Sequence, residues 1–236
     1  ESVKAQLIVS VTDKSPVMEY SVTEYAQTLL NDPSQPQEAK DLVKAMLNYG
    51  GYSQIKYAPE TVPANQVLEE TDRTLAEMPE IADTAYDRKI SGTAPTGISY
   101  YGSTLILGSR TSVRHYFKLK EGAEANGFTI TLSKEGTEAE ILTLQEKGGL
   151  YYVDVQGINA YDLGTMYTVT VTGTGSEKAE DADALSITYG FMSYVKEMYN
   201  AQISVSEETN DIISAIYWYY QKAVVYYAYQ NTSSEK

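Results

Sequence analysis

Few residues in this sequence have the type and spacing that catalysis requires. His115 is the only histidine, and it shares one face of a strand-like segment with Val113 and Phe117, which favours a structural, partly buried imidazole over a catalytic one. The chain has no cysteine, so disulfides, thiol chemistry and thiolate metal sites are excluded. No phosphate loop, dinucleotide fingerprint, Gly-x-Ser-x-Gly elbow or His-Glu-x-x-His motif occurs. We therefore predict no catalytic residue, no metal site and no cofactor.

Carboxylates are the one plentiful reactive group. The chain has 32 acidic and 18 basic residues and a formal charge of −14, which argues against nucleic acid and anionic membrane surfaces as partners. A glycosidase-type pair of carboxylates stays open, because no feature of the sequence selects one pair. The acidic run at 180–183 lacks the spacing of a calcium-binding loop, and we interpret it as a solvated surface.

Tyrosine is the other abundant residue type, with 22 in the chain. Most of the tyrosines recur at helical spacing, which is typical of packing. Two adjacent pairs lie on predicted strands instead, Tyr100 with Tyr101 and Tyr151 with Tyr152. Because side chains alternate along a strand, one member of each pair faces away from the core. These four residues are the candidate ligand-binding residues, with a sugar-stacking platform as the expected chemistry.

The longest helical pattern lies near the C-terminus, at residues 206–230. We predict Ser206 as its N-cap, with Glu207 and Glu208 in the first turn, where the helix dipole favours carboxylates. Two apolar stripes with a period of about 3.6 residues cover well over half of its circumference. A helix this apolar must be buried on more than one side, by another helix and by a sheet.

The N-terminal part predicts a β-hairpin followed by two helices. The strands lie at 3–11 and 17–20, and capping-box patterns begin helices at Ser21 and Ser34. The second helix runs toward Tyr57 and contains Gly50-Gly51, which we interpret as a notch for a bulky neighbour, with a helix end near Gly50 as the alternative.

An internal repeat relates the two ends of the chain. Asp41, Leu42, Ala45, Met46 and Tyr49 align with Asp211, Ile212, Ala215, Ile216 and Tyr219. Each copy predicts a strand, a short helix and a long helix, and we expect the two helical hairpins to pack as a four-helix layer. The aromatic residues 217–220 are then expected to fill the notch at Gly50-Gly51.

Between the repeats, residues from Gly97 onward change to the two-residue period of strands. Eight short candidate strands separated by glycine or polar breaks, among them 98–101, 104–107 and 140–146, predict an antiparallel, immunoglobulin-like β-sandwich. The predicted fold class is therefore α+β, with this sandwich inserted between the two helical hairpins. The expected divisions are an N-terminal β-hairpin at 1–20, a first helical hairpin at 21–58, a connector at 59–96, the sandwich at 97–189 and a second helical hairpin at 190–231.

Several segments resemble one module of bacterial surface proteins. They are 21–26 (SVTEYA), 42–50 (LVKAMLNYG), 97–103 (GISYYGS), 114–117 (RHYF) and 193–196 (SYVK). This pattern is similar to the C-terminal-type module of secreted and cell-surface multi-domain proteins of gut Clostridia (Firmicutes). The resemblance implies an extracellular, wall-associated location and further domains in a larger chain. It carries no established activity, so it assigns no catalytic residue.

Three functional hypotheses follow. The first is a non-catalytic extracellular module for adhesion, attachment or scaffolding on a Gram-positive gut bacterium, with a glycan or another surface protein as partner. The alternative is a carbohydrate-binding module that uses exposed tyrosines of the β-sandwich. An acid-pair hydrolase is the third. No stretch approaches the roughly 18 consecutive apolar residues of a membrane span, and we expect any targeting segment to have been removed.

Overall fold

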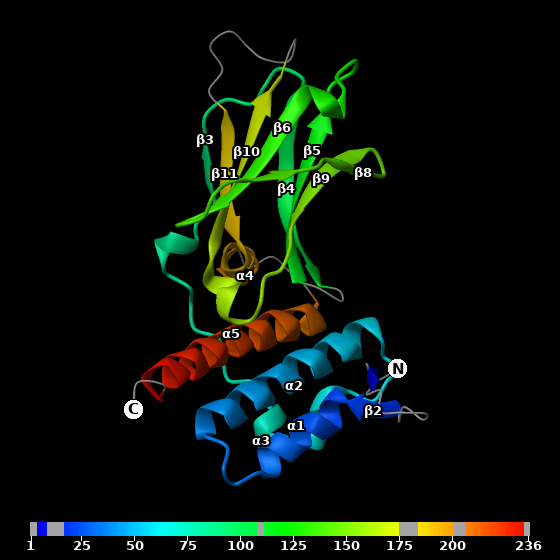
Figure 1. Ribbon diagram of the computed structural model, residues 1–236, viewed down its shortest axis with the longest axis vertical. Coiled ribbons are helices and arrows are strands. Elements are labelled where there is room, and N and C mark those ends of the chain that lie inside the picture. Colours follow the sequence, from blue (N-terminus) through cyan, green and yellow to red (C-terminus); the bar gives the residue numbers. More distant parts are fainter. Residues whose placement is uncertain (1–3, 9–16, 108–110, 175–183, 201–205, 234–236) are drawn as a thin grey trace. The chain divides into compact units, whose positions relative to one another are not determined.

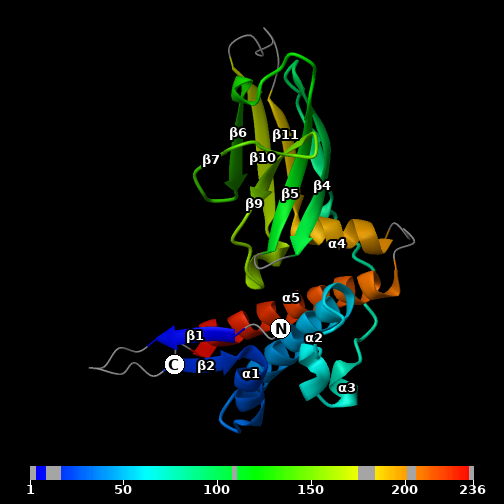
Figure 2. The same ribbon diagram turned by 90° about the vertical axis from the view of Figure 1, so that its right-hand side faces the viewer.

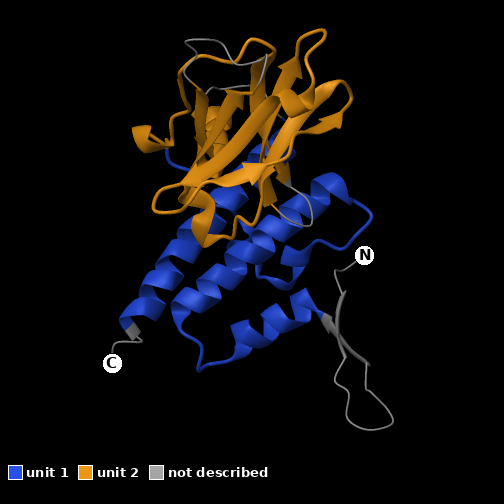
Figure 3. Ribbon diagram, turned by 45° about the horizontal axis from the view of Figure 1, so that its top comes forward, with its two compact units in different colours: residues 1–79, 204–236 blue, residues 80–203 orange. Residues whose placement is uncertain are grey.

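The structure is a computed structural model that describes residues 4–8, 17–107, 111–174, 184–200 and 206–233 (Figure 1). The protein is α+β, and its chain forms two compact units (Figure 3). The first unit contains residues 1–79 and 204–236, and the second contains residues 80–203. The predicted connector at 59–96 therefore belongs partly to each unit, because the boundary falls after residue 79. The predicted turn before Val17 and the acidic run at 180–183 lie outside the described residues.

The first unit, called the helical unit below, contains both ends of the chain. Its elements are β1 (Lys4–Ile8), β2 (Val17–Ser21), α1 (Val22–Asn31), α2 (Gln37–Tyr57), η1 (Ala64–Val67), α3 (Glu70–Arg73) and α5 (Glu207–Ser233). Strands β1 and β2 form an antiparallel pair, and α5 runs along α2 (Figures 1 and 2). The rings of Tyr49 and Tyr219 stack between these helices, with centroids 6.0 Å apart. The two long helices of the internal repeat therefore pack through equivalent tyrosines.

The notch in α2 is filled by a different neighbour from the one that we predicted. Asn65 of η1 lies against Gly51, where an added Cβ would come within 2.9 Å of the Asn65 Cβ. The expectation that residues 217–220 fill this notch is therefore wrong. The reason is local, because the Ala64 N–H donates to Gln54 Oε1 at 2.6 Å and holds η1 on α2. Beside it lies a core cluster of Ala26, Val43, Leu47 and Leu68.

The two predicted capping boxes do not form. Ser21 stands at the N-cap of α1 without a side-chain capping bond, and Pro36, not Ser34, is the N-cap of α2. The Ser34 hydroxyl donates instead to Asp32 Oδ1 at 2.7 Å, and the Ser34 N–H donates to the same oxygen at 2.8 Å. An Asx-type turn at Asp32 thus competes successfully for the serine that the sequence pattern assigned to the cap.

The second unit, called the β unit below, contains two antiparallel sheets (Figure 2). The five-stranded sheet has the order β3-β11-β10-β6-β7, and the four-stranded sheet has the order β4-β5-β9-β8. Their bounds are β3 (Lys89–Ser91), β4 (Ile98–Leu107), β5 (Thr111–Leu119), β6 (Phe128–Lys134), β7 (Glu140–Leu142), β8 (Gln145–Lys147), β9 (Leu150–Val155), β10 (Met166–Gly173) and β11 (Leu185–Gly190). Short 3-10 turns also occur: η2 (Thr84–Tyr86), η3 (Ala125–Gly127) and η4 (Tyr161–Gly164).

The apolar faces of the two sheets form the core of the β unit, as a β-sandwich requires. Val113, Phe117, Val169 and Ile187 are fully buried, and the His115 ring of β5 meets the Tyr189 ring of β11 edge-on, with centroids 6.2 Å apart. The immunoglobulin-like description of this sandwich stays a prediction.

Two details of the strands differ from the sequence prediction. The segment at 140–146, expected as one strand, divides into β7 in one sheet and β8 in the other. The candidate strands at 98–101 and 104–107 form one strand, β4, which is interrupted by a bulge between Tyr100 and Gly102. Both differences occur where the alternation of inward and outward side chains is interrupted locally. A two-residue period in the sequence does not locate such interruptions.

Helix α4 (Phe191–Asn200) belongs to the β unit. Its Phe191, Met192 and Val195 are buried, and Glu197 accepts from Tyr189 Oη at 2.9 Å and from Arg88 Nη2 at 2.7 Å. The expected four-helix layer, with α4 as a member, is not confirmed. Apolar residues at 190–200, which predicted one helix of the second hairpin, are instead buried within the β unit, where α4 contacts β11.

Candidate functional site

The outward face of the four-stranded sheet carries a row of tyrosines. Gly102 of β4 pairs with Tyr116 of β5, Tyr116 pairs with Tyr152 of β9, and Tyr152 pairs with Gln145 of β8. Paired residues point to the same side of a sheet, so these side chains form one row across the strands. We call this surface the tyrosine face; it consists of Tyr101, Arg114, Tyr116, Lys118, Gln145, Tyr152 and Asp154.

A bulge in β4 places Tyr101 on this face. The register shift between Tyr100 and Gly102 adds one residue to β4 opposite β5, and such an insertion re-aims the neighbouring side chains. The Tyr101 side chain is 58% exposed. The Lys118 ammonium lies 4.1 Å from the centroid of its ring, so a cation–π contact restrains the ring without burying it.

An ion pair lies beneath Tyr152. Arg114 Nε and Nη2 donate to the two carboxylate oxygens of Asp154, both at 2.7 Å, and the guanidinium carbon lies 3.7 Å from the centroid of the Tyr152 ring. The two charged side chains are only 12% and 11% exposed although they point outward. The Tyr152 ring therefore packs on the guanidinium with one face, and the residue is half-buried.

Further bonds fix this tyrosine row. The Tyr152 hydroxyl donates to Gln145 Oε1 at 2.7 Å, and the Tyr116 and Tyr152 rings have centroids 6.1 Å apart. Bonding to Asp154 raises the pKa of Arg114, so the guanidinium beneath the ring stays charged at any ordinary pH. Bidentate Arg–carboxylate pairs are geometrically specific, and the aromatic surface is therefore held in place before any ligand binds.

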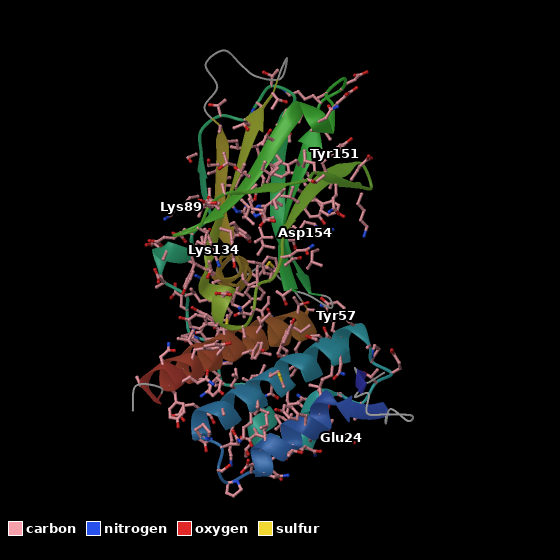
Figure 4. All side chains as sticks on the ribbon, in the orientation of Figure 1. Glu24, Tyr57, Lys89, Lys134, Tyr151 and Asp154 are labelled. Carbon is pink, nitrogen blue, oxygen red and sulfur yellow. The ribbon has the colours of Figure 1, made fainter. Side chains whose placement is uncertain are left out.

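The other two candidate residues face the interior. Tyr100 pairs with Phe117 and meets its ring edge-on, with centroids 6.0 Å apart, and its hydroxyl bonds to Ser103 Oγ at 2.7 Å. Burial raises the pKa of Tyr100. Tyr151, labelled with Asp154 in Figure 4, also pairs with Phe117. Of the four candidates, the structure thus brings Tyr101 and Tyr152 together on one face and places Tyr100 and Tyr151 on the opposite face.

His115 is a core residue. Its ring is fully buried, Nδ1 lies 2.8 Å from Ser103 Oγ, and burial together with the nearby Arg88 charge lowers its pKa to about 4. A serine beside a histidine is a typical nucleophile pair. Because no substrate reaches a fully buried imidazole, the arrangement is structural here, and the structural interpretation of His115 is confirmed.

The outward face of the five-stranded sheet has a different chemistry. Thr168 bonds to Thr188 at 2.8 Å, and Thr170 bonds to Ser186 at 3.1 Å. These hydroxyls satisfy each other across β10 and β11. This face therefore presents paired hydroxyl groups where the tyrosine face presents aromatic rings.

Sequence reasoning missed Tyr116, Arg114 and Asp154 as members of the site. Their signal was the alternation of β5, in which Arg114, Tyr116 and Lys118 take the positions between the buried Val113, His115 and Phe117. Alternation identifies the outward residues of one strand, but the register between β5 and β9 decides that Tyr116 stands beside Tyr152.

Among the described residues, no group of three or more histidine, aspartate or glutamate side chains is placed to hold a metal ion. None of the helices in the described part of the chain is both long and apolar enough to cross a bilayer.

Comparisons with known proteins add little to this description. No family model matches the chain, and no curated protein matches it. One solved structure, described as "Crystal structure of Br derivative BhCBM56", aligns with 42% of this chain and 97% of its own at 11% identity, with a TM-score of 0.28. A likeness of this size does not establish a shared fold, and the chain is assigned to no family.

Proposed function

We propose that this chain is a non-catalytic attachment module whose β unit binds carbohydrate through the tyrosine face. The observation that carries the proposal is the in-register row of Tyr116, Tyr152 and Gln145, with Tyr101 at its end. The apolar face of a sugar ring packs on an aromatic ring, and its hydroxyls bond to the amide and charged groups beside it. The row crosses four neighbouring strands about 4.8 Å apart, so a short oligosaccharide matches it better than a single sugar.

The electrostatics of the tyrosine face support a neutral glycan. Arg114 and Asp154 neutralise each other through two hydrogen bonds, and Lys118 is engaged with the Tyr101 ring. The surface thus presents aromatic rings and hydroxyls more than net charge. A strongly anionic or cationic polymer finds no matching cluster of opposite charge among these residues.

The wider setting that we propose is the surface of a Gram-positive gut bacterium. It is supported by the resemblance of 21–26, 42–50 and 193–196 to a module of secreted clostridial proteins. In that setting the module attaches a larger chain to a glycan or to another surface protein. Antibodies raised against this chain are expected to label intact cells of the source organism; labelling of lysed cells alone would contradict this location.

Removal of either outer tyrosine tests the binding proposal. Tyr152→Ala and Tyr101→Ala are each expected to weaken binding to the best ligand from a glycan array about fivefold or more, if one stacking ring contributes the roughly 1–3 kcal/mol that it contributes to binding a nucleobase. Tyr152→Phe keeps the ring and loses only the bond to Gln145, so it should bind within about threefold of the parent protein. Titration calorimetry with the purified chain measures all three.

The matched control is Tyr161→Ala. Tyr161 is 47% exposed and lies in η4 of the same unit, outside the tyrosine face. The proposal is wrong if the array gives no ligand, or if Tyr161→Ala reduces binding as much as Tyr152→Ala does.

A further inference from the structure

The helical unit contains a pocket that is separate from the tyrosine face. It has a volume of about 280 Å³ and is bordered by α2, by α3 with the segment that follows it, and by α5. We call it the helical pocket. Its polar and aromatic lining consists of Asp41, Lys44, Asn48, Asp72, Trp218 and Lys222. Ligand pockets commonly measure about 300–1,000 Å³, so this one matches a molecule with a single ring.

Two ion pairs line the helical pocket. Lys44 Nζ lies 2.9 Å from Asp72 Oδ2, and Lys222 Nζ lies 3.2 Å from Asp41 Oδ2. The four side chains are 32–40% exposed, so their polar atoms remain accessible to a ligand. An ammonium carries three donors and a carboxylate accepts about four hydrogen bonds, so neither ion pair exhausts the capacity of its partners.

The polar floor of the pocket is fixed by buried amides. Asn48 is 6% exposed; its Nδ2 donates to the Asp72 carbonyl oxygen at 2.7 Å, and its Oδ1 accepts from Asn65 at 3.3 Å. These bonds hold α3 against α2 and with it the Asp72 carboxylate. The Asn48 amide and the backbone of Asp72 therefore have fixed positions before a ligand enters.

Trp218 supplies an apolar wall. Its indole N–H donates to the Ala76 carbonyl oxygen at 2.9 Å, which fixes the ring in the pocket lining. Because the indole N–H is already bonded to Ala76, the ring presents only its apolar carbon surface to a ligand. An anchored indole beside alternating ammonium and carboxylate groups combines the two contacts that a sugar requires, one with its C–H face and one with neighbouring hydroxyls.

We propose that the helical pocket is a second ligand site, which binds one neutral saccharide ring. The sugar packs a C–H face on Trp218, while a pair of neighbouring hydroxyls donates to Asp72 or Asp41 and accepts from Lys44 or Lys222. The four charges sum to zero, so an anion meets two carboxylates and a cation meets two ammonium groups, and neither is favoured. This inference does not depend on the proposed role of the tyrosine face, because the residues belong to the other unit.

The chain provides its own reporter for this site, since Trp218 is the only tryptophan. Tryptophan emission is recorded while the purified full chain is titrated with glucose, galactose, mannose or N-acetylglucosamine. At least one of these sugars is expected to give a saturable change with a dissociation constant in the millimolar range. Sodium phosphate and glycine, an anion and a zwitterion of small size, serve as reference ligands and should give no saturable change.

Two substitutions locate the response. Asp72→Asn and Lys222→Gln each remove one charged hydrogen-bonding group and should weaken sugar binding about tenfold or more. Lys56→Gln is the matched control, because Lys56 lies on α2 of the same unit but outside the pocket lining, and it bonds to Ser206 and Thr209. Circular dichroism melting checks that each variant folds. If Asp72→Asn does not fold, the sugar affinity of Lys222→Gln alone tests the proposed site.

The outcomes separate this site from the tyrosine face. Tyr152→Ala should leave the tryptophan response unchanged. A saturable tryptophan response in the parent chain, together with array binding that Tyr152→Ala does not weaken, would overturn only the proposed function. The second site is refuted if no sugar gives a saturable response, if glycine or phosphate gives the same response, or if both folded variants bind like the Lys56→Gln control.

Discussion

Gly51→Ala destabilises the helical unit by about 2 kcal/mol, whereas Gly50→Ala stabilises it by up to about 1 kcal/mol. A Cβ on Gly51 overlaps the side chain of Asn65, including its Cβ at 2.9 Å. Because that Cβ is joined directly to the backbone of η1, a side-chain rotation alone does not relieve the overlap. The neighbouring Gly50 meets only the Ala64 Cβ at 3.6 Å, an ordinary contact, so it gains the helix propensity of alanine without strain.

Movement of Asn65 has further consequences. Asn65 is 3% exposed and donates to Asn48, whose own amide holds the Asp72 carbonyl. An alanine at position 51 therefore disturbs a buried amide chain as well as the packing of η1. Overpacking alone costs roughly 1–3 kcal/mol, and loss of a buried hydrogen bond adds about 1 kcal/mol. The gain in helix propensity, about 1 kcal/mol, offsets part of this cost.

Urea denaturation followed by tryptophan emission measures this effect in the helical unit, since Trp218 lies there. The midpoint should shift to lower urea for Gly51→Ala and to higher urea for Gly50→Ala, with unchanged slopes. Equal midpoints for the two variants would show that η1 does not occupy the notch.

The sequence predicts the elements of this protein better than their assembly. The helix at 206–230 is found as α5, Glu207–Ser233, because its apolar spacing and polar start are local signals. The internal repeat aligns Tyr49 with Tyr219, and the rings of these two residues stack. The four-helix layer that the same repeat predicted, with α4 as a member, is not confirmed, because an apolar stripe shows that a face is buried but not what buries it. Here Phe191 and Val195 are buried in the β unit.

The candidate site was partly predictable for a similar reason. Adjacent tyrosines on a strand guarantee one outward ring, which holds for Tyr101 and Tyr152. The choice of Tyr101 over Tyr100 also depends on the bulge in β4 at Gly102, and a glycine within a strand pattern is compatible both with a break between two strands and with a bulge in one. The Arg114–Asp154 pair joins residues 40 positions apart, a distance over which only strand register brings side chains together.

Acidification from pH 7.5 to 4.5 destabilises the β unit by about 2–3 kcal/mol through His115 alone. Burial, reinforced by the Arg88 charge, lowers the pKa of His115 from 6.5 to about 4. The unfolded chain therefore takes up a proton near pH 6.5 that the folded protein does not accept until about pH 4. The loss is absent well above pH 6.5, increases as the pH falls from 6.5 toward 4, and then levels off. Asp154 acts in the opposite direction on the pKa but is outweighed.

The single histidine makes both parts of this prediction measurable. The imidazole proton resonance should titrate with a pKa near 4 in the folded protein, and hydrogen exchange at β5 amides gives the stability of the β unit at each pH. His115→Asn keeps a polar group beside Ser103 and all the carboxylates, so the difference between its pH profile and that of the parent protein isolates the histidine. Parallel profiles between pH 7.5 and 4.5, or a folded-state pKa near 6.5, would show that the ring is hydrated and not buried in the core.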